Sequence, residues 1–413
     1  MFNDQQLIKH HFFRIHNTEL NEMYAVMSLR SFLLCMVGLF SSIYLYTLHF
    51  SIQEIFLTEL IMFSTEAVCE IFVSQIIIKY GPKHSMGFGM PVLAVYYWLL
   101  FSLPVYHWPI WFFSGVAGIS IALFWQAYHY DFSRSKKKNS ASSDVSKLYI
   151  FIAVAAAIAP FIGGTIASKF GFQVLLGIAT IGFLLAAIPL LWVGEKHKPV
   201  NFKLSRLKDK QLGREMMAYA GSGIEGSAGG TIWPLFTFLI LGSTQAVGFV
   251  TSLALILTVV ITYYVGKRGD KVNKKKYIQT GGIFVALSYF ARVFVSTMTH
   301  VVILNLISNA SHSIYTSPFV AEYYEHADEN SRAEYLFIME LTTDIARILF
   351  FGVLVLLGYF VDGILYLSIG LILGGFGAAL LTLMPASKRD IVSTKDAKIR
   401  VTPKLRSASN EVN

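Results

Sequence analysis

Ionisable side chains stand inside long apolar runs of this sequence, at spacings that place them on shared helical faces. A charged group at the centre of a bilayer costs about 2.5–3.5 kcal/mol on insertion scales, so such groups are expected to face protein or water. Carboxylates there can bind and release protons, and a guanidinium beside them can form an ion pair that opens and closes. Two groups follow this pattern: Glu59, Glu66 and Glu70 at spacings of 7 and 4, and Glu340, Asp344 and Arg347 at spacings of 4 and 3.

Amide, imidazole and lone charged side chains in other apolar runs offer hydrogen bonds to a polar ligand. Glu225 lies in the segment 221–230, where five glycines in ten residues weaken a helix, and broken helices often mark solute sites in membranes. Packing is the alternative explanation: a groove for a neighbouring helix at the glycines, helix–helix hydrogen bonds at the amides, and snorkelling of the lone arginines. The candidates are Arg30, Gln126, His129, Glu225, Asn305, Asn309 and His312, with Arg292 as a second lone base.

Sequence patterns typical of membrane-embedded enzymes and of ATP-driven pumps are not found: the chain has no HExxH, no GxSxG and no Walker-type glycine loop. Cys35 and Cys69 both lie in apolar runs, and they give neither a disulfide framework nor a metal-ligand spacing. The sequence therefore predicts that the protein is not an enzyme and that it uses no cofactor and no metal.

The elements that carry these groups are runs long enough to cross a membrane as helices. Of the 413 residues, 54% are hydrophobic and 14% are charged, against roughly 25% charged residues in soluble domains. A span needs about 20 apolar residues, and the chain offers about twelve such runs. We place them at residues 27–46, 55–78, 86–106, 108–130, 148–167, 172–193, 217–241, 246–265, 277–297, 301–323, 336–358 and 364–384. These runs predict an all-α polytopic membrane protein.

The spans divide into two groups of six, separated by a long polar stretch. At the start of the chain, residues 7–15 form an amphipathic segment suited to the membrane surface. The expected divisions are a leader (1–26), a first six-helix bundle (27–193), a linker (194–216), a second six-helix bundle (217–384) and a basic tail (385–413).

Lysines and arginines are distributed unevenly between the loops. The formal net charge is +9, and about 30 of the 34 basic side chains fall on one side when the N-terminus is placed inside. The positive-inside rule then puts both termini in the cytoplasm, in a multi-pass protein of the inner or plasma membrane. Because loops near anionic lipid account for the charge, we expect no binding to nucleic acid.

The loops after the second and eighth spans repeat a pattern of glycines and bases. The later loop resembles the signature of the major facilitator superfamily, with Asn273 in place of its second glycine, a residue that also tolerates left-handed turns. The earlier loop is a degraded copy, with Ile78 where the acid should be. The matching residues are Gly266, Asp270, Lys271, Lys274 and Lys275 in the later loop, and Lys79, Gly81 and Lys83 in the earlier one.

A small-residue element in the fifth span adds to the resemblance. Ala159, Pro160, Gly163 and Gly164 are similar to the Gly-Pro-x-x-Gly-Gly element of the drug-exporting antiporters of this superfamily. Close helix packing beside a proline bend is the alternative explanation. The fourth span has small residues at 114–118 but not the arginine that those antiporters usually have there.

The resemblance implies two pseudo-symmetric bundles that rock around a central site, with the second span packed against the eleventh. Glu66 and Arg347 each lie 12 residues from the inner ends of their spans, about 18 Å deep at 1.5 Å per residue, so we expect an ion pair between the halves. A static pair, or an Asp344–Arg347 pair within one helix, is the alternative. Glu70 and Asp344 share a depth, and because neighbouring carboxylates disfavour joint ionisation, we expect them to serve a proton relay.

The same resemblance implies a secondary transporter that works by alternating access. The element of the fifth span favours proton-coupled export of an amphipathic organic compound, which is the first expectation. The polar face of the tenth span favours proton-coupled uptake of a polar metabolite or other nutrient, which is the second. A non-transporting membrane receptor or scaffold is the alternative of another class. The expected partners are a small solute, protons and bilayer lipid, and the protein is expected to be a monomer.

Overall fold

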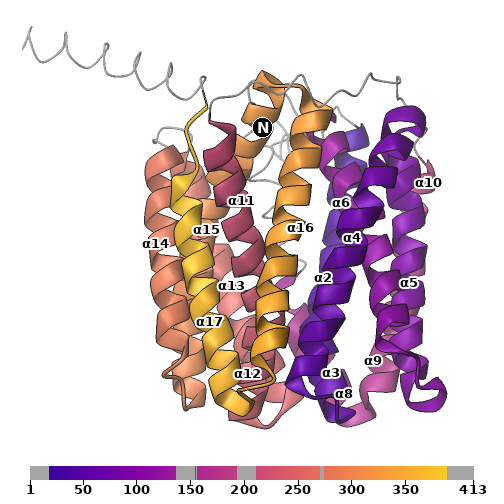
Figure 1. Ribbon diagram of the computed structural model, residues 1–413, viewed down its shortest axis with the longest axis vertical. Coiled ribbons are helices and arrows are strands. Elements are labelled where there is room, and N and C mark those ends of the chain that lie inside the picture. Colours follow the sequence, from indigo (N-terminus) through magenta and orange to yellow (C-terminus); the bar gives the residue numbers. More distant parts are fainter. Residues whose placement is uncertain (1–17, 136–153, 155, 193–210, 270–273, 388–413) are drawn as a thin grey trace, which may run out of the picture.

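Helices make up the regular structure of the residues that the computed structural model describes, which are 18–135, 154, 156–192, 211–269 and 274–387. They lie side by side along the long axis of the molecule (Figure 1). The first half contains α2 (Thr18–Val37), η1 (Gly38–Phe40), α3 (Ser41–Thr47), α4 (Ile52–Tyr80), α5 (Pro82–Tyr106), α6 (Ile110–Ser135), α8 (Ala159–Phe170), α9 (Phe172–Ala186) and α10 (Ile188–Trp192). The second half contains α11 (Leu212–Ser227), η3 (Ala228–Ile232), α12 (Trp233–Leu241), α13 (Thr244–Gly269), α14 (Lys274–Arg292), α15 (Met298–Glu329), α16 (Arg332–Leu357), α17 (Gly363–Leu380) and η4 (Leu381–Leu383).

Each predicted span overlaps a described helix or a stack of short helices. By length and composition, seven described stretches can cross a membrane. Helices α15 and α16 are more polar because they contain several candidate site residues, and α14 is more polar because it begins with three lysines. Among the differences in boundaries, α2 begins at Thr18, within the expected leader, α11 begins at Leu212, within the expected linker, and α15 extends to Glu329. The amphipathic segment 7–15 lies outside the described residues. The seven stretches are Ala25–Thr47, Ile52–Tyr80, Pro82–Tyr106, Ile110–Arg134, Phe172–Leu190, Leu212–Leu241 and Gly363–Leu383.

Local sequence explains where the second span begins and ends. The Ser51 hydroxyl accepts a hydrogen bond from the Glu54 amide, and the Glu54 carboxylate accepts one from the Ser51 amide, which forms a capping box. Gly81 ends α4 with a φ of +99°, a conformation that costs glycine little. Pro82 follows at the start of α5, where its missing amide hydrogen is not needed.

The first span of each half is interrupted in its middle. In the first half, the 3₁₀ turn η1 lies between α2 and α3. In the second half, the π-helical turn η3 lies between α11 and α12. Such turns leave backbone groups out of the regular α-helical pattern, and π turns occur frequently at functional sites. Both interruptions are therefore at positions that can shape a central cavity.

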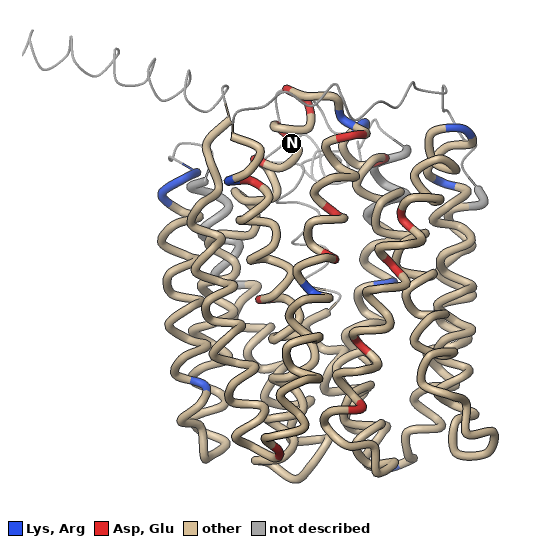
Figure 2. Tube along the Cα trace, viewed as in Figure 1, with Lys and Arg blue, Asp and Glu red and all other residues tan. Residues whose placement is uncertain are grey.

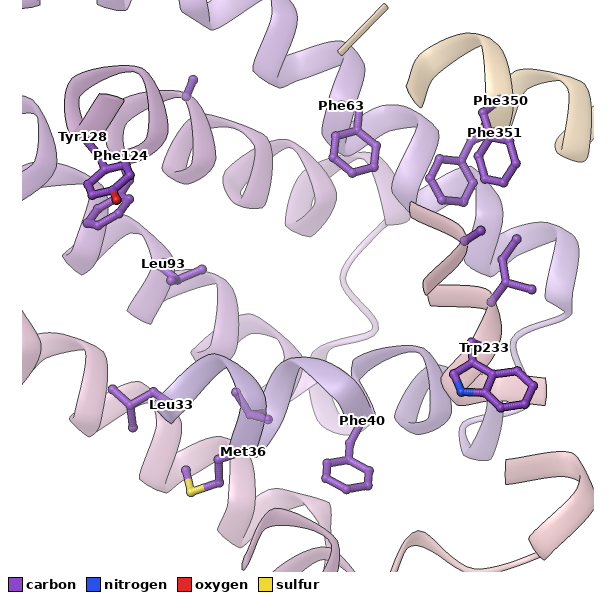
Figure 3. Close-up of a cluster of buried hydrophobic side chains, with 14 of the residues drawn as sticks. Leu33, Met36, Phe40, Phe63, Leu93, Phe124, Tyr128, Trp233, Phe350 and Phe351 are labelled. Atoms are coloured by element: carbon purple, nitrogen blue, oxygen red, sulfur yellow. The ribbon is translucent and has the colours of Figure 1, made fainter. Parts of the chain in front are cut away.

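Two pairs of helices make the largest contacts between the halves: α4 packs on α16, and α8 packs on α13. Along the α4–α16 seam, the rings of Phe63 and Phe351 stack with their centroids 5.8 Å apart (Figure 3). Phe56 lies against Phe351 at the same distance. These rings belong to a buried apolar cluster that continues into the first span at Met36 and Phe40. Aromatic packing therefore surrounds the charged groups that α4 and α16 also contain.

Many of the lysine and arginine positions along the chain lie at one end of the molecule (Figure 2). We call it the basic end; α4 finishes there with Lys79, and α14 begins there with Lys274. Acidic residues lie both at the basic end and along the helices (Figure 2). Among those along the helices, Glu66, Glu70 and Asp344 are buried.

Candidate functional site

Three carboxylates meet where α4 crosses α16. Oxygen atoms of Glu66, Glu70 and Asp344 all lie within 4.8 Å of one another, and each side chain is at most 2% exposed. Both oxygens of Glu70 are buried, and neither has a hydrogen-bond partner among the described residues. The structure thus brings together acids from the two predicted faces, one on each half of the molecule. Carboxylates this close could bind protons or a cation.

Arg347 is the base of this cluster. Its Nη1 lies 3.9 Å from Glu66 Oε2 on the other half and 3.3 Å from Asp344 Oδ1 on its own helix. The predicted pair between the halves and the alternative pair within α16 are therefore both present. The guanidinium also lies 4.8 Å from the centroid of Phe63. One guanidinium cannot balance three ionised carboxylates, so full ionisation would leave uncompensated buried charge.

A second polar contact between the halves lies nearer the basic end. His129 Nε2, from α6, is 3.5 Å from Glu340 Oε1 on α16, and His129 Nδ1 is 2.9 Å from the Tyr324 hydroxyl on α15. The Tyr323 hydroxyl donates to Glu340 Oε1 at 2.8 Å. Glu340 and His129, both predicted as site residues, are thus joined directly. The two tyrosines were not predicted, because nothing in their spacing distinguishes them from an aromatic belt.

Glu225 lies in α11, which stays α-helical through Gly226 and changes to the π turn η3 at Ala228, within the glycine-rich segment. Its carboxylate accepts hydrogen bonds from the hydroxyls of Tyr289 at 3.1 Å and Tyr315 at 3.3 Å. The glycines of this segment have different surroundings. A side chain at Gly223 would collide with Thr343 of α16, whereas a side chain at Gly226 would enter open space. Helix packing thus explains part of the segment, and the rest borders a cavity.

The interruption of this span comes just after Glu225, in the π turn η3. Within this turn, the Thr231 hydroxyl donates to Glu59 Oε1 at 3.0 Å. The Ser42 hydroxyl approaches the Thr231 carbonyl oxygen at 3.5 Å. Because Glu59 and Ser42 belong to the first half, the π turn is a third polar contact between the halves.

The polar face of α15 also borders a cavity. Trp233 Nε1 donates to Asn305 Oδ1 at 2.7 Å, and His312 Nδ1 lies 2.8 Å from the Thr316 hydroxyl. Asn309, one turn from Asn305, lines the same space. All three residues predicted on this face therefore lie where a solute could contact them.

Two adjoining chambers run through the centre of the molecule. The first has a volume of about 280 Å³ and the second about 250 Å³, and both are bordered by Glu225, Gly226 and His312. The first chamber contains ionisable residues from both halves: Glu66, His129, Glu340 and Arg347. The second chamber contains Trp233, Tyr289, Arg292, Asn305, Ser308 and Asn309. Their combined volume is in the range of small-molecule sites.

Two other predicted residues lie beside these chambers. Arg30 is buried, and its guanidinium carbon lies 4.1 Å from the ring centroid of Phe124 and 4.9 Å from that of Trp125. Trp125 in turn lines the first chamber. Gln126 is buried, and its Oε1 has no hydrogen-bond partner among the described residues. An aromatic layer therefore lies between Arg30 and the chamber.

The signature loops lie at the basic end, away from the chambers. Lys274 Nζ forms ion pairs with Glu325 at 2.7 Å and Glu322 at 3.2 Å. Lys79 lies over the ring of Tyr80, and Lys83 is buried at the start of α5. Asp270 and Lys271 lie outside the described residues, whereas Gly266 is helical and Lys275 begins α14 with its neighbours.

The element of the fifth span forms the α8–α13 seam. A side chain at Gly163 would collide with the Met36 carbonyl oxygen of α2, and one at Gly164 with the Thr244 carbonyl oxygen of α13. A side chain at Gly248 of α13 would likewise collide with the Pro160 carbonyl oxygen of α8. These close approaches account for the small residues by packing.

Comparison with known proteins assigns the family. The sequence profile described as Major Facilitator Superfamily matches residues 23–351, which is most of the chain. The protein belongs to the major facilitator superfamily. It is therefore a multi-pass membrane transporter and not an enzyme. No curated protein matches this superfamily member by sequence.

Three transporters are among the solved structures that resemble this protein. The E. coli fucose:proton symporter FucP is 11% identical, with a TM-score of 0.62 over 87% of this chain and 97% of that one. The nucleoside transporter NupG is 13% identical, with a TM-score of 0.61 over 88% and 98%. A POT family transporter in complex with 5-aminolevulinic acid is 14% identical, with a TM-score of 0.66 over 90% and 96%. At these identities the likeness concerns the fold.

Proposed function

We propose that this transporter couples the movement of protons to that of a small polar solute. The observation that carries the proposal is the Glu66–Glu70–Asp344 cluster, buried between the halves and served by the single guanidinium of Arg347. A proton on one of the acids removes a charge that Arg347 cannot balance. Proton binding and the arrangement of the two halves are therefore linked at the same place.

The cluster suggests how this link works. While Arg347 is held between Glu66 and Asp344, the ion pairs join α4 to α16. A proton that reaches Glu66 removes its charge and weakens the bond between the halves. Arg347 then keeps Asp344 on its own helix, and the halves are free to rock. Glu70, whose oxygens accept no hydrogen bond from the described residues, can hold a proton beside them.

Uptake is the direction we favour. The small-residue element that favoured export is explained by packing at the α8–α13 seam. The chambers present amide, imidazole and hydroxyl groups, which suit a polar solute better than an amphipathic drug. The likeness to a fucose:proton symporter agrees with this choice. Export of an amphipathic compound remains the second candidate, because the fifth-span element resembles that of exporters.

The lysines and arginines of the loops support one orientation of the protein in the membrane. We propose that the basic end faces the cytoplasm of an inner or plasma membrane, with both termini on that side. Labelling of intact cells with a membrane-impermeant thiol reagent tests this. One variant carries a cysteine in place of exposed Asp362 at the opposite end, and another carries a cysteine in place of Lys275 at the basic end. Labelling of the Lys275 position from outside would contradict it.

Sealed vesicles with a trapped pH indicator test the coupling. Purified protein is reconstituted without a pH gradient, and sugars, nucleosides, amino acids, peptides and organic acids are added outside one class at a time. Symport acidifies the lumen when a substrate enters, whereas antiport makes it alkaline. Repeating the assay with and without sodium separates protons from a cation at the same acids. Solute binding without any flux would instead favour a receptor or scaffold.

A further inference from the structure

Arg292 is a buried base of the second chamber and is not used in the coupling scheme. It ends α14 and is 4% exposed. Its guanidinium carbon lies 4.2 Å from the ring centroid of Tyr289 and 4.5 Å from that of Trp233. Its Nη2 donates to the Ser308 hydroxyl at 2.9 Å. Ser308 is ten residues into α15, so the contact is about 15 Å from that helix end.

The charge of Arg292 is not balanced by a neighbouring acid. Within the described part of the chain, no carboxylate lies within 4.0 Å of its nitrogens, whereas Arg347 has two such neighbours. Its Nε and Nη1 are buried and donate no hydrogen bond to described residues. Glu225, which borders the same chamber, already accepts from two tyrosine hydroxyls. A buried guanidinium in this state is costly unless an anion joins it.

The groups around Arg292 suit a flat anion. Guanidinium and carboxylate are both planar and can form two parallel hydrogen bonds. Because an indole can only donate, the Trp233–Asn305 bond fixes Oδ1 of Asn305 toward Trp233 and leaves its amide hydrogens for the chamber. Trp233 and Tyr289 supply an apolar wall beside these donors. The chamber therefore combines a charged donor, a neutral donor and aromatic surface.

We propose that Arg292 binds a carboxylate group of the transported solute, with Asn305 as a second donor. The proposal rests on the proposed function, because it names the class of solute that the same cavity accepts: small organic acids or amino acids. The carboxylate of the solute then balances the positive charge of the Arg292 guanidinium. An empty chamber would retain an unbalanced base, so the ligand stabilises the fold around it.

Three probes of the same size and different charge test this proposal. Benzoate, benzamide and benzamidine carry negative, zero and positive charge on one ring. Purified full-length protein in detergent is melted with a thiol-reactive dye that reports on Cys35 and Cys69, at matched ionic strength. We expect benzoate to raise the midpoint in a saturable way, and the neutral and cationic probes not to do so. Equal stabilisation by benzamide or benzamidine, or none by benzoate, overturns the proposal.

Variants identify the binding group. We expect Arg292→Gln to weaken benzoate about 10- to 100-fold, the effect of one charge-assisted hydrogen-bond pair. Arg292→Lys, which keeps the charge but not the planar fork, should give an intermediate affinity and covers the case in which the glutamine variant does not fold. Arg332→Gln, in an ion pair with Asp328 outside the chambers, is the matched control and should leave benzoate affinity unchanged. Unchanged affinity in both Arg292 variants overturns the proposal.

Binding and transport can fail separately in these experiments. The melting assay needs no flux, so benzoate binding through Arg292 without proton-coupled movement would refute only the proposed function. Proton-coupled flux of a neutral sugar or nucleoside, with no effect of Arg292→Lys on its half-saturation, would refute only the carboxylate site.

Discussion

Arg347 Nη1 lies 3.9 Å from Glu66 Oε2, although the two residues belong to opposite halves of the molecule. Glu66 is almost completely buried, and aromatic rings of α4 and α16 pack along the same seam. An ion pair in such surroundings is sensitive to any change in the distance between the halves. The contact is therefore well placed to respond when the transporter changes its shape.

Exchanging the charges of this pair tests whether it matters for transport. We expect Glu66→Arg and Arg347→Glu each to reduce flux at least about tenfold, because a single change leaves like charges buried together at a cost of about 3–5 kcal/mol. The double exchange should recover a large part of the flux in the vesicle assay. Arg332→Gln, whose pair with Asp328 is partly exposed, should change flux little. If the double exchange is as inactive as either single variant, the pair has no switching role.

Neutralising Glu70 should separate proton coupling from solute movement. Glu70→Gln keeps the shape of the side chain but removes a site for a proton. We expect solute-dependent acidification to disappear, while exchange of labelled for unlabelled solute continues at a rate within a few fold of the unmodified protein. Asp362→Asn, an exposed carboxylate between α16 and α17, is the control and should leave both signals intact. Retained acidification in Glu70→Gln would remove this residue from the coupling scheme.

Filling the close contact between α8 and α2 should destabilise the protein. In Gly163→Ala, the new methyl group would meet the Met36 backbone, and overpacking of this kind costs about 1–3 kcal/mol. The melting midpoint should fall accordingly. Gly87→Ala in α5 is the matched control, since nothing lies within 4 Å of its new methyl group, and alanine favours a helix by about 1 kcal/mol. An equal midpoint in the two variants would contradict this account of the element.

Removing one residue from the π turn should convert η3 into a regular helix. A π turn contains an extra residue, so deletion of Gly230, which faces open space, leaves α11 and α12 in register. We expect a folded protein with a nearly unchanged midpoint and at least about tenfold lower flux, because the Thr231–Glu59 contact is moved. Deletion of Gly87 within regular α5 rotates the following residues by about 100° and should abolish folding. Full flux after deletion of Gly230 would show that the turn is dispensable.

The position of each charged residue along its helix could be predicted from the sequence. Glu66, Glu70 and Asp344 could be placed by counting residues, because helices advance by a constant rise and apolar runs mark the membrane. Which helices touch came from the resemblance to a known family, since spacing within one helix says nothing about its neighbours. The two kinds of information together led to the Glu66–Arg347 pair.

Contacts made by tyrosines and tryptophan could not be found in the same way. Tyr289 and Tyr315 meet at Glu225 from two different helices, and their residue type is equally typical of an aromatic belt. Arg292 could be recognised as a lone base, but its lack of a neighbouring acid depends on the packing of α12, α14 and α15. Pattern alone also could not show that α11 continues past Gly226 and changes to a π turn two residues later.

The seam between α8 and α13 has a consequence for motion. At Gly164 and Gly248 the main chains approach one another, and neither glycine places a side chain between them. Two hydrogen bonds span the seam, from Thr244 to the Gly164 carbonyl and from the Phe161 amide to Ser252. Such a contact fixes the distance between two rods but offers little resistance to changes in the angle between them. We expect the seam to act as an axle, about which each half turns while its own interior stays rigid.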